Sequence, residues 1–322
     1  MAAVPAVSVD VEAKPDMATA TDQLAAFTRG NYSTKSITVD TSNSSSPPKQ
    51  LFIVVPDEQG TYNVIIFFHG TCLSHTSYTQ LFEHMASHGF IVVAPQLYNF
   101  LLPSGNKEIN SAAEVINWLT TGLRLNLPEN VKANLNLVAL MGHSRGGRTA
   151  FALALGYAKN PAVSLQFSAI VGIDPVAGTT KMTELDPPIL SLDSFNFTTP
   201  VAVIGTGLGG VSRCVAPCAP ERANHEQFFN RCKSSRAHFV ATDYGHMDML
   251  DDNPSDWKSW AMSKCMFKNG KESRDPMRRC VGGIAMAFLK DYFDGQSGDL
   301  KKIVEEPSVA PIKLDPVQFI EA

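Results

Sequence analysis

The sequence GHSRG at residues 142–146 places Ser144 between two glycines, each two positions away. A serine alcohol attacks a carbonyl carbon only where its oxygen lies beside a base and beside donors for the developing oxyanion. A sharp turn from a strand into a helix provides this, and glycines at these positions prevent side-chain collisions in the turn. The apolar run 137–142 and the small-residue stretch 149–158 supply that context. We therefore predict that Ser144 is the nucleophile of an acyl-transfer enzyme.

An ordinary glycine–serine turn in a nucleotide-binding protein is the alternative interpretation of this motif. The chain around Ser144 has no GxGxxG pattern and no lysine directly before the serine. Phosphate-binding loops depend on these features, because backbone N–H groups and a lysine charge hold the phosphate. Nucleotide binding is therefore not favoured.

A serine nucleophile needs a histidine base, and the expected chain order is serine, acid, histidine. Three histidines follow Ser144. His246 comes shortly after the apolar run 238–243, where a loop at a strand end would hold a base. His225 precedes a helix in a cysteine-rich loop and remains an alternative, whereas His238 begins a strand at the opposite sheet edge. We predict His246 as the base.

The acid that orients the histidine is predicted from the next strand along the chain. Asp174 ends the run 169–174, 30 residues after Ser144, which is room for one helix and one strand. Asp174 would then lie at the same sheet edge as the serine. Asp186 and Asp193, in a loop that could fold back, remain alternatives. The acids that flank His246 are typical of helix caps and solvated surface.

The oxyanion would be held by two backbone N–H groups. We predict the N–H of Arg145, directly after the nucleophile, and that of Thr71, in the loop after the run 64–68. A metal is not expected, because Cys214 and Cys218 have no second pair at matching spacing. The six cysteines are either buried thiols or form one or two disulfides.

Six short apolar runs rich in β-branched residues alternate with amphipathic stretches. The runs are continuous rather than alternating, which a parallel sheet buried on both faces requires. We predict a single α/β domain with a mostly parallel central sheet and helices on both faces. The predicted strands are 64–68, 90–95, 137–142, 169–174, 201–206 and 238–243, and the predicted helices are 77–89, 111–125, 149–158 and 276–293.

Composition limits the classes of protein that fit. The 322 residues carry a net charge of −4, which lacks the basic footprint of a nucleic-acid-binding protein. No apolar run reaches the ~18 residues that span a bilayer. The first residues lack the pattern of a secretory signal and carry acids, unlike a transit peptide. We predict a mobile arm at 1–35, the domain at 36–295 and a tail at 296–322.

Three long segments without regular pattern follow strand ends, at 99–109, 180–199 and 207–226. Loops of this length are typically functional, and open α/β sheets bind ligands at the carboxyl ends of their strands. They predict a cap over an apolar cleft. A loop that merely covers the core is the alternative. The predicted substrate-binding residues are Leu73, Leu97, Tyr98, Phe100, Leu101 and Leu102.

With these motifs in place, the sequence resembles the chlorophyllases of the α/β-hydrolase superfamily. The resemblance covers roughly residues 50–310 and differs at residues 71–73 and in the loop 214–232. It rests on FFHG (67–70), ASHGFIVVAPQL (86–97), GHSRGG (142–147), GIDPVAGT (172–179), PVAVIGTGLG (200–209) and HFVATDYGHMDMLDD (238–252).

The resemblance implies a triad of Ser144, Asp174 and His246, in agreement with the spacing argument. It also implies hydrolysis of the phytyl ester of chlorophyll to chlorophyllide and phytol without a cofactor. A chloroplast location follows, with the cytosol as alternative, and so does peripheral contact with a pigment-bearing membrane. Two other functions remain open: a lipase or esterase acting on other lipid-like esters, and a non-catalytic binder of pigment or small molecules.

Overall fold

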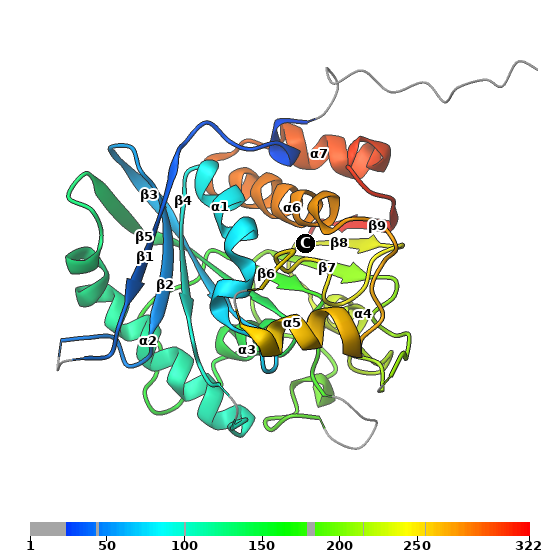
Figure 1. Cartoon of the computed structure of the whole chain (residues 1–322), viewed down its shortest axis with the longest axis horizontal. Coiled ribbons are helices and arrows are strands. Elements are labelled where there is room, and N and C mark those ends of the chain that lie inside the picture. Colours follow the sequence, from blue (N-terminus) through cyan, green and yellow to red (C-terminus); the bar gives the residue numbers. More distant parts are fainter. Residues whose placement is uncertain (1–23, 43–44, 100, 179–183, 215, 255) are drawn as a thin grey trace, which may run out of the picture.

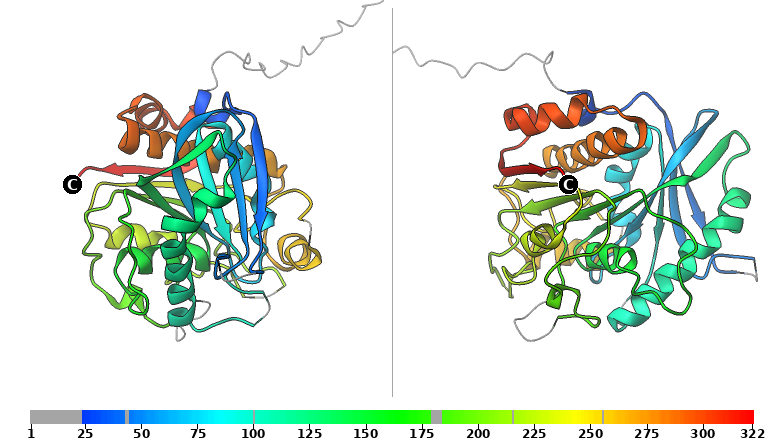
Figure 2. Two further views of the ribbon diagram at one scale, coloured as in Figure 1. Left: turned by 90° about the vertical axis from the view of Figure 1, so that its left-hand side faces the viewer. Right: turned by 180° about the vertical axis from the view of Figure 1, so that it is seen from behind.

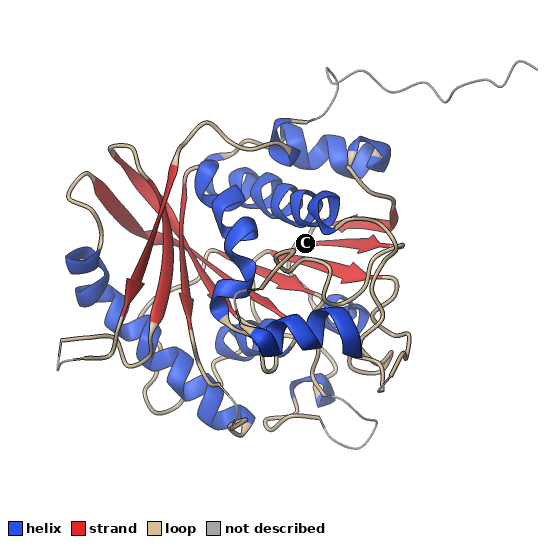
Figure 3. Cartoon of the chain, in the orientation of Figure 1, coloured by secondary structure: helices blue, strands red, loops and turns tan. Residues whose placement is uncertain are grey.

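A single sheet runs through the centre of the computed structural model, which describes residues 24–42, 45–99, 101–178, 184–214, 216–254 and 256–322 (Figures 1 and 3). Within these residues the sheet has nine strands, in the order β1-β2-β4-β3-β5-β6-β7-β8-β9. Their bounds are β1 Thr34–Val39, β2 Leu51–Pro56, β3 Gly60–Phe68, β4 Phe90–Pro95, β5 Val131–His143, β6 Ala169–Ile173, β7 Val201–Thr206, β8 Arg236–Ala241 and β9 Leu314–Ile320.

The six strands from β4 to β8 in this order are parallel to one another. The edge strands β1 and β9 pair antiparallel with their neighbours β2 and β8, and β2 also pairs antiparallel with β4. Figure 1 shows a strong twist between the strands β1–β4 and the strands β7–β9, as the chirality of extended L-residues dictates. The carboxyl ends of β5, β6 and β8 therefore meet at one edge, from which the loops carrying the predicted nucleophile, acid and base emerge.

Helices cover both faces of the sheet (Figure 2). One buried cluster joins the sheet to α1, α6 and α7, and a second joins it to α2, α3 and α4. The α-helices are α1 Thr79–Ser87, α2 Gly105–Asn126, α3 Arg145–Ala154, α4 His225–Arg231, α5 Trp257–Ala261, α6 Arg274–Asp294 and α7 Gly298–Glu305. The 3₁₀ turns are η1 Ala25–Phe27, η2 His75–Tyr78, η3 Ile189–Ser191 and η5 Pro307–Val309. A π-helical turn, η4 Met262–Met266, follows α5.

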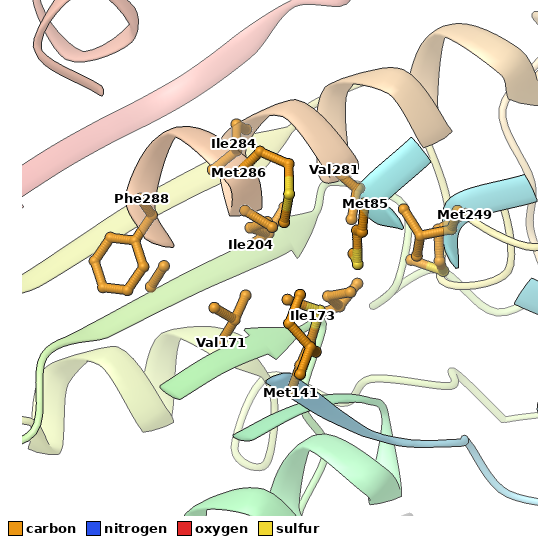
Figure 4. Packing of buried hydrophobic residues seen from close by; sticks show 14 of the residues in the cluster. Met85, Met141, Val171, Ile173, Ile204, Met249, Val281, Ile284, Met286 and Phe288 are labelled. Carbon is orange, nitrogen blue, oxygen red and sulfur yellow. The ribbon is translucent and has the colours of Figure 1, made fainter. Parts of the chain in front are cut away.

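The face under α6 shows how the sequence pattern produces this packing (Figure 4). Val281, Ile284 and Phe288 recur at intervals of three and four, so they lie on one side of α6. They pack toward Ile173 and Ile204 of the sheet, and all five side chains are at most 1 % exposed. Methionines fill the remaining space, which suits their flexible side chains.

The predicted α/β fold class is confirmed, with several differences in the bounds. The strand at β5 begins at Val131 rather than 137, and α2 begins at Gly105 inside the predicted loop 99–109. Ser104 caps α2 by accepting a hydrogen bond from the N–H of Lys107. The predicted helix 149–158 instead begins at Arg145 and ends at Ala154. Its N-terminus therefore directly follows Ser144.

Residues 296–322 differ from the predicted tail. They contain α7 and the edge strand β9, whose residues pair with β8 from Arg236 to Ala241. The segment LDPVQFI has only weak strand character, and its pairing partner is about eighty residues away. Of the predicted arm at 1–35, residues 1–23 lie outside the described residues. Phe27 is fully buried against Gly283 of α6.

Several histidines are buried in the core as neutral hydrogen-bonding groups. His84 of α1 donates from Nε2 to the carbonyl oxygen of Ala26, at 2.9 Å. Burial lowers the pKa of His84 to about 4, and the neighbouring imidazole of His88 acts in the same direction. Burial likewise lowers the pKa values of His69 and His238 to about 4. Protonating any of them would place a cation in an apolar environment, so we expect acid to destabilise the fold through these sites.

The substitution His84→Gln tests this coupling. Between pH ~6.5 and ~4 the unfolded chain protonates this histidine and the folded chain does not, so its contribution to stability is lost as pH falls. The glutamine amide keeps a donor for Ala26 but does not titrate. Relative to wild type, the variant should therefore gain on the order of 3 kcal/mol between pH 7 and pH 4. Urea unfolding at both pH values measures this, and a pH-independent difference would contradict it.

Candidate active site

Ser144 lies in a sharp turn between β5 and α3. Its backbone has φ 57° and ψ −124°, a strained conformation for a residue with a side chain. A Cβ atom at Gly142 would lie 2.4 Å from the carbonyl carbon of Gly146, and one at Gly146 would lie 2.1 Å from the carbonyl oxygen of Phe68. Only glycine fits at both positions, which explains the GxSxG spacing that predicted the turn.

The structure brings the three predicted side chains together. The distance from Ser144 Oγ to His246 Nε2 is 2.8 Å, and that from His246 Nδ1 to Asp174 Oδ2 is 2.6 Å. Since a carboxylate only accepts, Nδ1 carries the proton and Nε2 is free to accept one from the serine. Asp174 is fully buried, and the other two are nearly so. This arrangement can activate an alcohol for attack on an ester.

Asp174 follows β6 at the expected edge and is held as a carboxylate. The N–H and the hydroxyl of Thr206 donate to its two oxygens, at 3.2 and 2.7 Å. Burial alone would raise the pKa of Asp174. The hydrogen bond from His246 and the charge on that imidazole oppose this rise, and His225 and Thr206 act in the same direction. Together they outweigh burial and lower the pKa of Asp174 to about 2. The carboxylate therefore stays ionised across the range in which a histidine base operates.

The alternative residues lie elsewhere. His225 Nε2 is 4.0 Å from the other oxygen of Asp174, and its Nδ1 is 2.9 Å from His238 Nε2. Burial lowers the pKa of His225, so it faces the acid as a second, mostly neutral imidazole. Asp186 and Asp193 are exposed, and Asp186 bonds to Asn106. None of these four has a hydrogen bond to Ser144 or His246 among the described residues.

A buried chain of hydrogen bonds that the sequence analysis missed joins three loops of the site. The carbonyl oxygen of His246 accepts from His143 Nε2 at 2.8 Å, which fixes Nδ1 of His143 as an acceptor. The Tyr78 hydroxyl donates to that Nδ1 at 2.8 Å and accepts from the N–H of Gly70 at 3.0 Å. Burial holds the pKa of His143 well below its usual value, which keeps this pattern of donors unchanged.

The two predicted oxyanion donors border the same space as the serine. Arg145 is the first residue of α3, so its N–H has no acceptor within the helix. Thr71 and Arg145 line the cavity into which Ser144 opens. A Cβ atom on Gly70 would lie 3.3 Å from the Ser144 Cβ, so the loop that carries Thr71 passes close to the nucleophile. These placements agree with an oxyanion hole at this position.

The Arg145 side chain turns away from the reacting atoms into a buried ion pair with Glu108 of α2. Glu108 also accepts from the Thr149 hydroxyl at 2.7 Å, and the guanidinium lies 5.2 Å above the Tyr98 ring. Burial raises the pKa of Glu108, and the charge of Arg145 opposes that rise. The pair ties the first turn of α3 to α2. Glu108 gave no signal in the sequence, because it lies in the predicted loop 99–109, whereas the structure places it in the first turn of α2.

A cavity of about 520 Å³ opens beside Ser144 and His246. Its wall is mostly apolar, with side chains from Leu102, Val176, Leu185, Met247, Met262 and Phe267. This volume and lining are typical of sites for apolar ligands. Among the predicted substrate-binding residues, Leu102 lines the cavity, Leu101 is exposed, and Leu73, Leu97 and Tyr98 are buried. Phe100 lies outside the described residues.

The described residues contain no cluster of three or more His, Cys, Asp or Glu side chains that could hold a metal ion. Of the two alternatives for the cysteines, the structure has thiols at the described positions: Cys72, Cys214, Cys218, Cys232 and Cys280 are free. The side chain of Cys265 is outside the described part. Within the same limits, no helix is long and apolar enough to cross a bilayer.

Comparison of the sequence with known proteins identifies its family. The chlorophyllase family model matches residues 22–321. A chloroplastic chlorophyllase-1 of Citrus unshiu is 65 % identical, over 98 % of this chain and 94 % of its own length. The chain belongs to the chlorophyllase family. Other relatives are chlorophyllase-1 of Arabidopsis thaliana, 48 % identical over 92 % of this chain and 93 % of its own, and chlorophyllase-2 of the same plant, 46 % identical over 86 % and 92 %.

Within this chlorophyllase-family chain, Tyr78→Phe tests the hydrogen-bond chain behind the site. The substitution leaves the N–H of Gly70 and the Nδ1 of His143 without their partner, which should cost about 1–3 kcal/mol of stability. Because both groups support loops of the site, we expect kcat for a soluble nitrophenyl ester to fall more than KM changes. Urea unfolding and steady-state kinetics measure the two effects.

Tyr157→Phe, which removes a hydroxyl in the loop after α3, is the matched control. Its stability and kcat should stay at wild-type values. A Tyr78→Phe protein with unchanged stability and unchanged kcat would show that the chain does not support the site.

Proposed function

We propose that the chain is a serine carboxylester hydrolase that cleaves the phytyl ester of chlorophyll to chlorophyllide and phytol. One observation carries this proposal: the Ser144–His246–Asp174 hydrogen bonds of 2.8 and 2.6 Å, at the wall of an apolar cavity, in a chain of the chlorophyllase family. The relatives named chlorophyllase support the pigment ester as substrate, and the chloroplastic one supports a chloroplast location.

The proposed reaction has two steps. In the first, His246 Nε2 takes the Ser144 proton as Oγ attacks the ester carbonyl, and the N–H groups of Thr71 and Arg145 hold the oxyanion. His246 then gives the proton to the departing phytol oxygen, leaving the pigment acid bound to Ser144 as an ester. In the second step His246 takes a proton from water, the resulting hydroxide releases chlorophyllide, and the proton returns to Ser144. Asp174 stabilises the imidazolium in both.

The cavity suits a long apolar alcohol or the edge of a pigment ring better than a polar substrate. Its apolar side chains come from segments that are distant in sequence, including Leu102, Val176, Met262 and Phe267. Burial of apolar surface provides about 25 cal/mol per Å², so a phytyl chain would gain affinity here. A lipase or esterase for other lipid-like esters would use the same features. Comparing rates on chlorophyll, triacylglycerol and nitrophenyl esters separates the two.

Ser144→Ala is the direct test of the proposed chemistry. Removing the nucleophile should lower kcat on chlorophyll by about 10⁴-fold or more, since the remaining groups cannot form the covalent ester. Pigment binding should persist, because the cavity wall is unchanged. Separation of chlorophyllide from chlorophyll measures turnover, and quenching of intrinsic fluorescence measures binding.

Ser234→Ala is the control. Ser234 is buried, and its hydroxyl has no hydrogen-bond partner among the described residues, so turnover should be unaffected. Turnover retained by Ser144→Ala would reject the assignment. A wild-type protein that binds pigment without turnover, and that a fluorophosphonate fails to label, would favour the non-catalytic binder.

A further inference from the structure

Two tryptophans are exposed on α5, which lies on the outside of the molecule (Figure 1). Trp257 is 72 % exposed and Trp260 is 46 % exposed. They are three residues apart, so they lie on the same side of the helix. Large aromatic side chains gathered in solvent are uncommon unless they contact a partner. The folded chain itself does not explain their position.

The tryptophans are continuous in sequence with the wall of the cavity. The helix passes from α5 into η4, and Met262 of η4 and Phe267 just after it line the cavity beside Ser144. The loop between β4 and α2 contributes Leu102, which also lines the cavity. Its neighbour Leu101 is 90 % exposed. We call Leu101, Leu102, Trp257 and Trp260 the apolar rim. Leu102 lines the cavity itself, and the other three members are exposed within five residues of side chains that line it.

Positive charge accompanies the apolar rim. Residues 257–271 contain four lysines and no acidic residue, although the chain as a whole has a net charge of −4. Arg213 adds a guanidinium, which donates to the carbonyl oxygens of Lys264 and Phe267. The four lysines are Lys258, Lys264, Lys268 and Lys271.

Three of the four acids that flank this segment are bonded within the fold, and the fourth, Glu272, is exposed beside Lys271. Asp251 accepts from the N–H groups that begin α1, at 3.0 and 2.9 Å, and Asp252 pairs with Arg278 at 2.7 Å. Asp256 caps α5 by accepting from the N–H of Ser259. These three carboxylates are held by local partners, and the four lysines with Arg213 outnumber the one exposed carboxylate, so the segment has a net positive charge.

We propose that the apolar rim docks on the surface of an anionic lipid bilayer and opens the cavity directly to it. Tryptophan favours the interface between headgroups and acyl chains, and lysines are attracted to anionic headgroups. The core of a protein–protein interface is depleted in lysine, which makes a protein partner a poorer fit for this mixture. This inference rests on the proposed function, because a pigment ester held in a membrane would reach Ser144 through the rim.

Vesicle binding tests the surface. Full-length protein is sedimented with vesicles of phosphatidylcholine alone and of phosphatidylcholine with phosphatidylglycerol. Wild type should prefer the anionic vesicles, and added salt should weaken binding. The double variant Trp257→Ser, Trp260→Ser should bind both kinds about tenfold less. The double variant Lys268→Gln, Lys271→Gln should lose about fivefold per lysine on anionic vesicles alone.

Matched controls remove an exposed apolar side chain and two exposed lysines far from the rim. Leu125→Ser deletes an exposed hydrophobic side chain at the other end of α2, about 30 Å from its start. Lys35→Gln with Lys132→Gln removes two exposed lysines from β1 and β5. Both controls should bind vesicles like wild type. All variants should hydrolyse a soluble nitrophenyl ester at the wild-type rate, which shows that they are folded.

The docking inference is overturned if wild type does not bind anionic vesicles, if the tryptophan variant binds as wild type, or if Leu125→Ser loses as much. It is also overturned if the tryptophan variant only abolishes self-association of the wild-type protein. Failure of the proposed function looks different: wild type then binds vesicles through the rim but does not hydrolyse chlorophyll in detergent micelles.

Discussion

The imidazole of His246 needs a carboxylate at Nδ1 and a hydroxyl at Nε2 at the same time, and the rest of the structure follows from that requirement. Both contacts are shorter than 3 Å and are shielded from solvent. Such precision cannot come from loops alone. It comes from β5 and β6, neighbouring parallel strands whose carboxyl ends present Ser144 and Asp174 side by side.

Buried neutral histidines provide much of the support. His143, directly before the nucleophile, bonds to Tyr78 and to the backbone of His246, and so connects the loops around the reaction site. His69 donates to the carbonyl oxygen of Gly70 and accepts from the N–H of Leu97. An imidazole can donate at one nitrogen and accept at the other, which suits it to join two backbone segments in a dry interior. Because burial lowers the pKa values of these histidines, their protonation in acid would destabilise the fold.

The loops around the sheet edge have two different roles, one in alignment of the reacting groups and one in forming the apolar wall. Those closest to Ser144 are fixed by hydrogen bonds and by glycines that allow backbone atoms to approach closely. Those farther out supply the apolar wall and the exposed tryptophans. A rigid centre keeps the reacting groups aligned, while an apolar exterior suits a substrate that is poorly soluble in water. The proposed chemistry and the proposed docking surface thus use different parts of the same edge.

Local sterics and hydrophobic pattern are enough to predict the strand–turn–helix at Ser144, the chain order of nucleophile, acid and base, and the α/β class. The folded chain was needed to show that His225 lies against the far oxygen of Asp174, that Tyr78 supports His143 and Glu108 supports Arg145, and that the last residues form an edge strand. These contacts join residues tens of positions apart. Their partners are selected by packing in three dimensions, which no short stretch of sequence encodes.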